Sequence, residues 1–141
     1  MPEHENDLLV SMDVVSTSAT IGQLSTALGI EPTLAISHER GTRRAGGGIW
    51  SMTTWRLDSG CPRKSPIADH IRALLEIFPI DNLGSTSQLP REVKIVLNIG
   101  VMAPSFCDTL DIPSEYLKRV GEAGIELSIA VYAPRGDQDE K

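Results

Sequence analysis

The residues best suited to binding chemistry in this chain lie in one basic, glycine-rich segment. It reads GTRRAGGGIW from Gly41 to Trp50. Backbone N–H groups of glycines beside arginines suit an anion, and an indole beside arginines suits a protein contact. We expect this segment to bind either a small anion or an acidic protein surface, and the alternative is a flexible hairpin loop without a ligand. The candidate binding residues are Arg40, Arg43, Arg44, Gly46, Gly47, Gly48, Trp50 and, on the strand that follows, Arg56.

The same segment does not fit the phosphate-binding loop of nucleotide hydrolases. That loop needs a lysine where this chain has Gly47, a serine or threonine where it has Gly48, and then a helix. We expect a strand next instead, so nucleotide hydrolysis is excluded.

The two tryptophans are predicted to have different surroundings. Positions 50 and 55 differ by an odd number, so in a regular strand their side chains point to opposite faces. Trp55 shares a face with Thr53 and Leu57, which we assign to the core. Trp50 then faces solvent or a partner, unless a bulge among the glycines resets the alternation and the indole packs under the loop against the core.

Few residues of this chain are candidates for catalysis. Cys61 and His38 are the reactive groups that we nominate, while Cys61 and Cys107 are expected to be reduced, unreactive thiols. The histidines His4, His38 and His70 lack the spacing of a metal site, and His70 is expected on a solvated helix turn. We therefore predict no metal and no cofactor, and the balance of the sequence is against an enzyme.

Composition restricts the class of protein further. The 141 residues fit a single domain, and the net charge of −6 disfavours general binding to nucleic acid. The charge is uneven, because residues 38–72 hold seven basic and three acidic residues, a local charge of +4. The sequence contains no apolar run long enough to cross a membrane, and its acidic start is unlike a signal peptide, so a cytoplasmic location is expected.

The elements that must position these residues follow from the apolar periodicity. Helices are predicted between Thr20 and Gly29, between Ser65 and Pro79, and between Asp111 and Gly124, each with an apolar stripe. Thr20 is expected to form a capping box and Gly29 to end the first helix in the left-handed conformation. Ser65 is expected to cap the second helix, and Leu117 to face inward on the third. Strands are predicted over residues 8–15, 33–37, 51–57, 93–101 and 125–132.

The resulting order is β-α-β-β-α-β-α-β. Strands that alternate between apolar and polar residues are typical of a sheet with one solvated face. We therefore predict an α+β fold, a two-layer sandwich of three helices on a mainly antiparallel sheet of about five strands, broadly ferredoxin-like. The domain is expected over residues 7–133, with disordered tails at residues 1–6 and 134–141.

Three motifs carry a resemblance to a known family. They are LGIEPT after the first helix, WRLDSG from Trp55, and GEAGIELSIAVY at the end of the domain. In this order the chain resembles the bacterial family of domain of unknown function 4279, over about residues 8–133. The resemblance implies a small bacterial α+β domain and implies no activity. The triple glycine and paired arginines look longer and more basic than the usual loop of the family, which makes them a feature of this chain.

Three hypotheses about function follow. The first is a non-catalytic binding module that contacts an acidic protein or a small anion through residues 40–56. The second is a structural domain that forms a homo-oligomer through an exposed strand edge. The third is an enzyme of unassigned class that uses Cys61 or His38.

Overall fold

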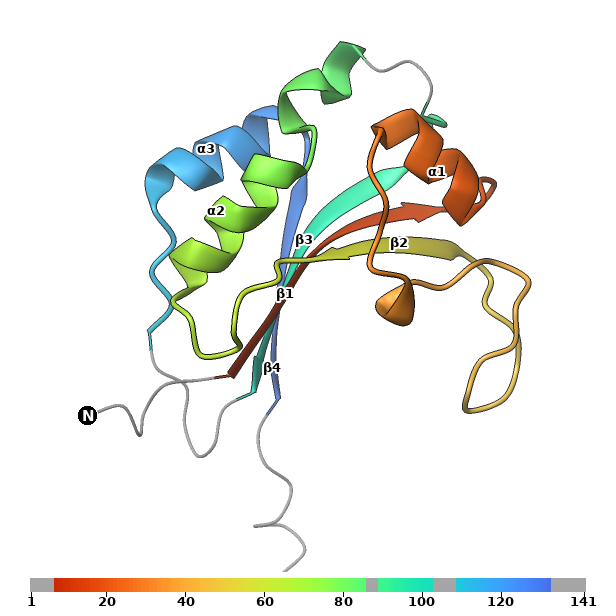
Figure 1. Ribbon diagram of the computed structural model, residues 1–141, viewed down its shortest axis with the longest axis horizontal. Coiled ribbons are helices and arrows are strands. Elements are labelled where there is room, and N and C mark those ends of the chain that lie inside the picture. The colour runs from red at the N-terminus through yellow and green to blue at the C-terminus, as the bar shows by residue number, and fades with distance from the viewer. Residues whose placement is uncertain (1–6, 86–88, 103–108, 133–141) are drawn as a thin grey trace, which may run out of the picture.

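A four-stranded sheet forms the centre of the computed structural model, which describes residues 7–85, 89–102 and 109–132 (Figure 1). Strand β1 (Asp7–Ser16) lies inside the sheet and pairs antiparallel with β2 (Thr53–Asp58) on one side and with β3 (Lys94–Met102) on the other. Strand β4 (Glu126–Tyr132) pairs parallel with β3, so the order across the sheet is β2-β1-β3-β4.

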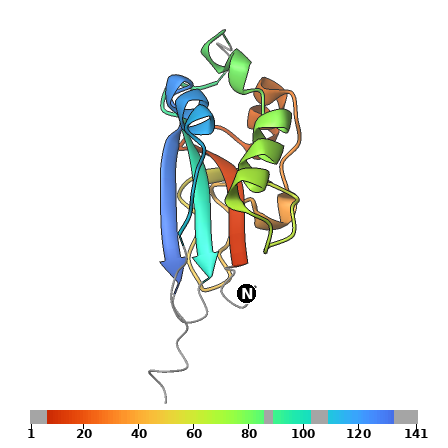
Figure 2. The same ribbon diagram turned by 90° about the vertical axis from the view of Figure 1, so that its left-hand side faces the viewer.

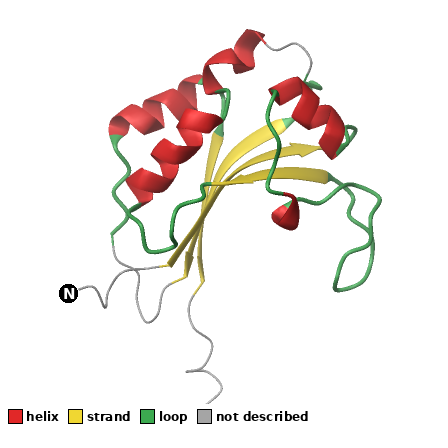
Figure 3. Ribbon diagram, in the orientation of Figure 1, coloured by secondary structure: helices red, strands yellow, loops and turns green. Residues whose placement is uncertain are grey.

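Three helices lie on one side of this sheet: α1 (Ile21–Leu28), α2 (Ile67–Ile77) and α3 (Ser114–Glu122). Figures 2 and 3 show them as a separate layer, while the other face of the sheet carries no described helix except the short 3-10 helix η2 (Leu34–Ile36). The predicted α+β two-layer sandwich is therefore confirmed. Its element order is not the β-α-β-β-α-β of a ferredoxin-like domain, and its β3–β4 pair is parallel.

Apolar side chains on the helix-facing side of the strands build the core. Met12, Val14 and Trp55 are fully buried there, and the predicted stripe of α2 packs against them. Burial of these residues is the main favourable term in holding the helices on the sheet. The buried stripe of α2 and its end consists of Ile67, Ile71, Leu74, Leu75 and Phe78.

The strand predicted over residues 33–37 is wrong, because η2 occupies that place. The hydroxyl of Thr33 accepts from Asp58 N at 3.0 Å, and the hydroxyl of Ser37 accepts from Arg56 N at 2.9 Å. Side-chain hydroxyls thus accept the hydrogen bonds that the carbonyls of a strand beside β2 would accept. The chain between Thr33 and Ser37 is therefore free to turn. Over the described residues the sheet has four strands, and the order is β-α-β-α-β-α-β.

Two smaller expectations also need correction. Ser65 does not cap α2, because the N-cap position is Pro66 and no side chain bonds the free N–H groups there. Leu117 of α3 is 43% exposed instead of packing inward. The capping box of Thr20 and the left-handed Gly29 at the end of α1 are confirmed.

The remaining expectations about the ends of the domain lie outside the described residues. These are the tails at residues 1–6 and 134–141 and the thiol of Cys107. Among the described helices, none has the length and apolar composition needed to cross a membrane.

Candidate functional site

Residues 40–50 form a hairpin that leads into β2, and it is here named the arginine hairpin. At its base Gly41 N donates to Trp50 O at 2.8 Å, and near its tip Arg44 N donates to Gly48 O at 3.0 Å. Figure 1 shows this hairpin extending away from β2 on the side opposite α1. It is therefore an ordered projection beside the open face of the sheet.

The glycines of the hairpin allow the backbone conformation of its turn. Gly47 and Gly48 have φ angles of 103° and 85°, a region that L side chains rarely adopt. The N–H of Gly47 is already used, because it donates to Arg44 O at 3.1 Å. This use of the N–H, together with the exposure of the turn, argues against an anion nest built from the glycines.

The indole of Trp50 is held by two neighbouring side chains. The ring of His38 stacks on it with centroids 3.9 Å apart and an interplanar angle of 17°. The guanidinium carbon of Arg44 lies 4.6 Å from the centroid of the indole, a cation–π contact. Trp50 is half-buried and is not part of the described core, so it is neither a free indole nor a lid on the core.

The positive charge of the hairpin is exposed to solvent. Arg40, Arg43 and Arg44 are all exposed, and within the described residues none of them forms a salt bridge. The nearest carboxylate in the sequence, that of Glu39, accepts instead from Ile21 N at 2.9 Å and so caps α1. The hairpin thus presents a charge of +3 on a chain whose net charge is −6.

The histidine that stacks on the indole has a lowered pKa. Burial of its ring lowers the pKa of His38 below the ordinary 6.5, and the charges of Arg56 and Arg44 lower it further. A neutral imidazole can stack flat on the indole without adding repulsion to the two arginines. His38 is therefore a support for Trp50.

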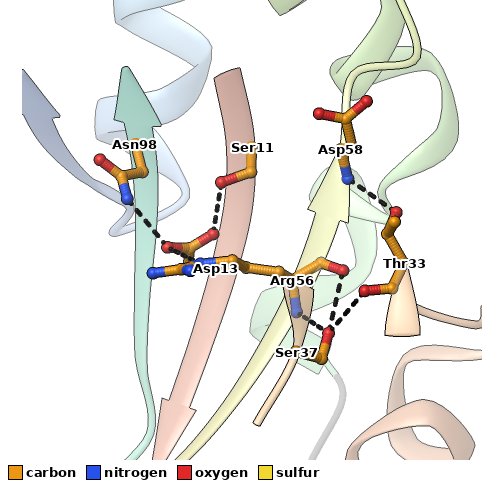
Figure 4. A network of polar contacts seen from close by, with 7 residues as sticks. All are labelled: Ser11, Asp13, Thr33, Ser37, Arg56, Asp58 and Asn98. Carbon is orange, nitrogen blue, oxygen red and sulfur yellow. Dashed lines mark hydrogen bonds and ion pairs between the residues drawn. The ribbon is translucent and has the colours of Figure 1, made fainter. Parts of the chain in front are cut away.

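Arg56 belongs to a different part of the surface, a polar network on the open face of the sheet (Figure 4). Its Nε donates to the Oδ2 of Asp13 at 3.0 Å, and Asn98 Nδ2 donates to the same oxygen at 3.2 Å. Ser11 Oγ donates to the other oxygen, Asp13 Oδ1, at 2.7 Å. Three donors from three strands thus compensate one buried carboxylate.

A shallow hollow of about 260 Å³ lies beside this network. The ring of Tyr132 lies over Gly100, where an added Cβ would be 3.5 Å from Tyr132 Cε2. The hollow has apolar and polar residues in its lining, among them Leu9, Ile36, Arg56, Asn98, Gly100 and Tyr132.

The structure therefore divides the predicted site residues into two groups. The arginine hairpin brings together Arg40, Arg43, Arg44, the three glycines and Trp50, whereas the side chain of Arg56 is committed to Asp13. The sequence reasoning missed Asp13 and Asn98. Their signal was present, because both interrupt apolar runs at positions that alternate away from the core.

His70 is buried, which corrects the expectation of a solvated residue. The residue is 1% exposed, and its Nδ1 lies 2.6 Å from Ser59 Oγ. Within the described residues its Nε2 has no hydrogen-bond partner. Because Ser59 is also buried, this serine–histidine pair is inaccessible to a substrate and belongs to the packing between β2 and α2.

The burial of His70 makes the stability of the protein depend on pH. Desolvation lowers its pKa below 6.5 more strongly than the charges of Asp58 and Asp69 and the carbonyls of Pro62 and Arg63 raise it. The unfolded state then binds more protons than the folded state, so the free energy of unfolding falls as the pH drops from roughly 7 to 5. Urea unfolding at a series of pH values measures this slope.

His70→Asn provides the control for that prediction. An asparagine amide can take the place of Nδ1 beside Ser59 but does not titrate, so the variant should lose part of the slope between those pH values. A slope identical to that of the wild type would show that the lowered pKa of His70 does not contribute.

The residues nominated for catalysis are not arranged as a pair. His38 stacks on Trp50, while the Sγ of Cys61 donates to Asp69 O at 3.7 Å. Within the described residues no group of three or more metal-binding side chains comes together.

The chain matches a known family model. The family model described as "Domain of unknown function (DUF4279)" matches residues 4–134. No curated protein and no solved structure matches the chain.

Proposed function

Because this chain belongs to the DUF4279 family, whose description assigns no activity, we propose a function from the geometry alone: a non-catalytic module that binds an acidic protein surface. The contact surface is the arginine hairpin with the adjoining open face around Arg56. The observation that supports it most directly is the exposure of three arginines that, within the described residues, form no salt bridge.

The acidic side chains near the hairpin are used elsewhere. Glu39 caps α1, and Asp13 is bound by Arg56. Arginines that form no salt bridge with the described residues add little to the stability of their own chain, but they favour association with a negatively charged surface. Trp50 adds a rigid aromatic surface at the base of the same projection, of the kind found at the centres of protein interfaces.

The shape favours a protein over a small anion. A small anion binds best where several donors converge in a concave, partly desolvated site. Residues 40–49 are all exposed, and the turn N–H of Gly47 is already bonded. An extended patch of guanidinium groups is better matched by several carboxylates on one partner surface.

Poly-L-glutamate is a suitable probe for this proposal, with the fluorescence of Trp50 as the readout. Titration should change the fluorescence of the wild type, and binding should weaken as salt is added. The triple variant Arg40→Gln, Arg43→Gln, Arg44→Gln should bind roughly 10-fold more weakly or worse, because three interfacial ion pairs contribute about 0.5–1 kcal/mol each.

Two controls keep the test specific. Removing three exposed cations elsewhere, with Arg63→Gln, Arg91→Gln and Lys118→Gln, gives the same net charge and should retain most of the binding. The Trp50→Phe variant should bind without the fluorescence change. Equal loss in both triple variants would reduce the effect to net charge, and tighter binding of inorganic pyrophosphate than of poly-L-glutamate would favour a small anion; either result would overturn the proposal.

A further inference from the structure

The two outer edges of the sheet are built differently. Along β2, His38 and Thr54 exchange backbone hydrogen bonds of 2.9 and 2.7 Å, and Thr33 N donates to Arg56 O at 2.7 Å. The hydroxyls of Thr33 and Ser37 accept from the remaining outward N–H groups of Asp58 and Arg56. The β2 edge is thus closed by the chain itself.

The β4 edge has no such cover in the described part of the chain. Among the described strands β4 pairs only with β3, and Figure 2 shows it as the outermost strand of the sheet. Its seven residues contain no proline and no lysine, and the pairing with β3 runs without a bulge from Glu126 to Tyr132. Proteins that stay monomeric usually protect such an edge with one of these features.

The side chains of β4 on the helix-facing side are apolar and exposed. Leu127, Ile129 and Val131 are 40%, 46% and 54% exposed, although their partners in β3 are fully buried. The apolar stripe of the core thus continues to the edge of the sheet, and its last three side chains stay at least 40% exposed although α3 lies on the same side. Single exposed apolar residues are ordinary, but three in a row on an open strand mark a contact surface.

The sequence of β4 is complementary to itself when two copies run antiparallel. A two-fold axis perpendicular to the sheet, through Ile129, places each Ile129 opposite the other and each Leu127 opposite Val131 of the second copy. On the other face, Ser128 lies opposite Ala130, and Glu126 lies opposite Tyr132. The only charged residue of the strand therefore avoids its own copy, and apolar residues meet apolar residues.

We propose that this protein forms a homodimer through antiparallel β4–β4 pairing centred on Ile129, which joins two sheets into one of eight strands. The perpendicular axis leaves both helix layers on one side and both open faces on the other. The two arginine hairpins then project from the same side of the dimer. This inference stands on β4 alone and does not depend on what the hairpin binds.

Light scattering of the full chain over a dilution series tests the assembly. The wild type should have the mass of two chains at the higher concentrations, and Ile129→Lys should halve that mass, because two ammonium groups would meet at the axis. Leu34→Lys, an equally drastic change at an exposed apolar residue of η2, should leave the dimer intact. A mass of one chain for the wild type at every concentration, or an unchanged mass for Ile129→Lys, would overturn the proposal.

Cysteine cross-linking tests the register, even if the lysine variant fails to fold. In a background with Cys61→Ser and Cys107→Ser, Ile129→Cys places two thiols directly opposite each other, within the span of a disulfide. Leu127→Cys is the matched control, because its two copies would be four residues out of register. Oxidation should cross-link the first variant and not the second, and cross-linking of the control alone would contradict the pairing.

Discussion

Replacing Trp55 with alanine is expected to lower the free energy of unfolding by about 3–5 kcal/mol, a large share of the stability of a domain this size. Its ring is fully buried and packs against Phe78 with centroids 6.0 Å apart. Its Nε1 also donates to Ser25 Oγ at 3.1 Å, so the substitution leaves both a cavity and a buried hydroxyl without its donor. Urea unfolding followed by circular dichroism measures the change.

Trp50 supplies the matched control for that prediction. It is the same residue type a few positions earlier, but it is half-buried and lies outside the described core. Trp50→Ala should therefore cost less than about 1 kcal/mol, as surface substitutions generally do. Equal losses at the two positions would mean that the arginine hairpin is part of the folded core, and the binding surface proposed for it would then lose its basis.

Replacing Arg56 with methionine is expected to lower the free energy of unfolding by about 2 kcal/mol, because it leaves a buried carboxylate without its counter-charge. The side chain of Asp13 is 5% exposed, whereas that of Arg56 is 32% exposed. Exposure of the arginine screens part of the attraction, and Ser11 and Asn98 still donate to the carboxylate, so the expected loss is smaller than for a fully buried pair.

Replacing Asp13 instead of Arg56 should lower the free energy of unfolding less. In Asp13→Asn the remaining charge is on Arg56, which solvent can reach, so the expected loss is below about 1 kcal/mol. Adding Asp13→Asn to Arg56→Met should restore part of the stability, because the charge that was left alone is removed. Urea unfolding of the two single variants and the double variant measures this cycle, and strictly additive losses would show that the two side chains do not act as a pair.

Local sequence patterns were sufficient to predict an element and its buried face where one strong apolar periodicity dominated. The stripe of α2, the capping box of Thr20 and the inward position of Trp55 all depend on residues close together in the sequence. Such spacing predicts which side of an element is apolar, because the periods of helices and strands are fixed by backbone geometry. The α+β class followed from those elements.

Two wrong predictions concern residues whose contacts lie in distant segments of the chain. Residues 33–37 alternate like a strand, yet the hydroxyls of Thr33 and Ser37 bond to β2 and turn the chain into η2. His70 looked like a solvated residue on a helix turn, but the fold places it against Ser59. In both cases the partner is more than ten residues away, beyond what a local pattern contains.

The candidate binding surface was likewise predictable only in part from local sequence patterns. Residue types and their spacing are enough to state charge and turn preference, so the basic, glycine-rich segment with an indole could be identified from the sequence. The fold was needed to show that the side chain of Arg56 pairs with Asp13 while the arginines of the hairpin stay exposed. It also decided which edge of the sheet is closed and which is open, since edge pairing joins segments that lie far apart in the chain.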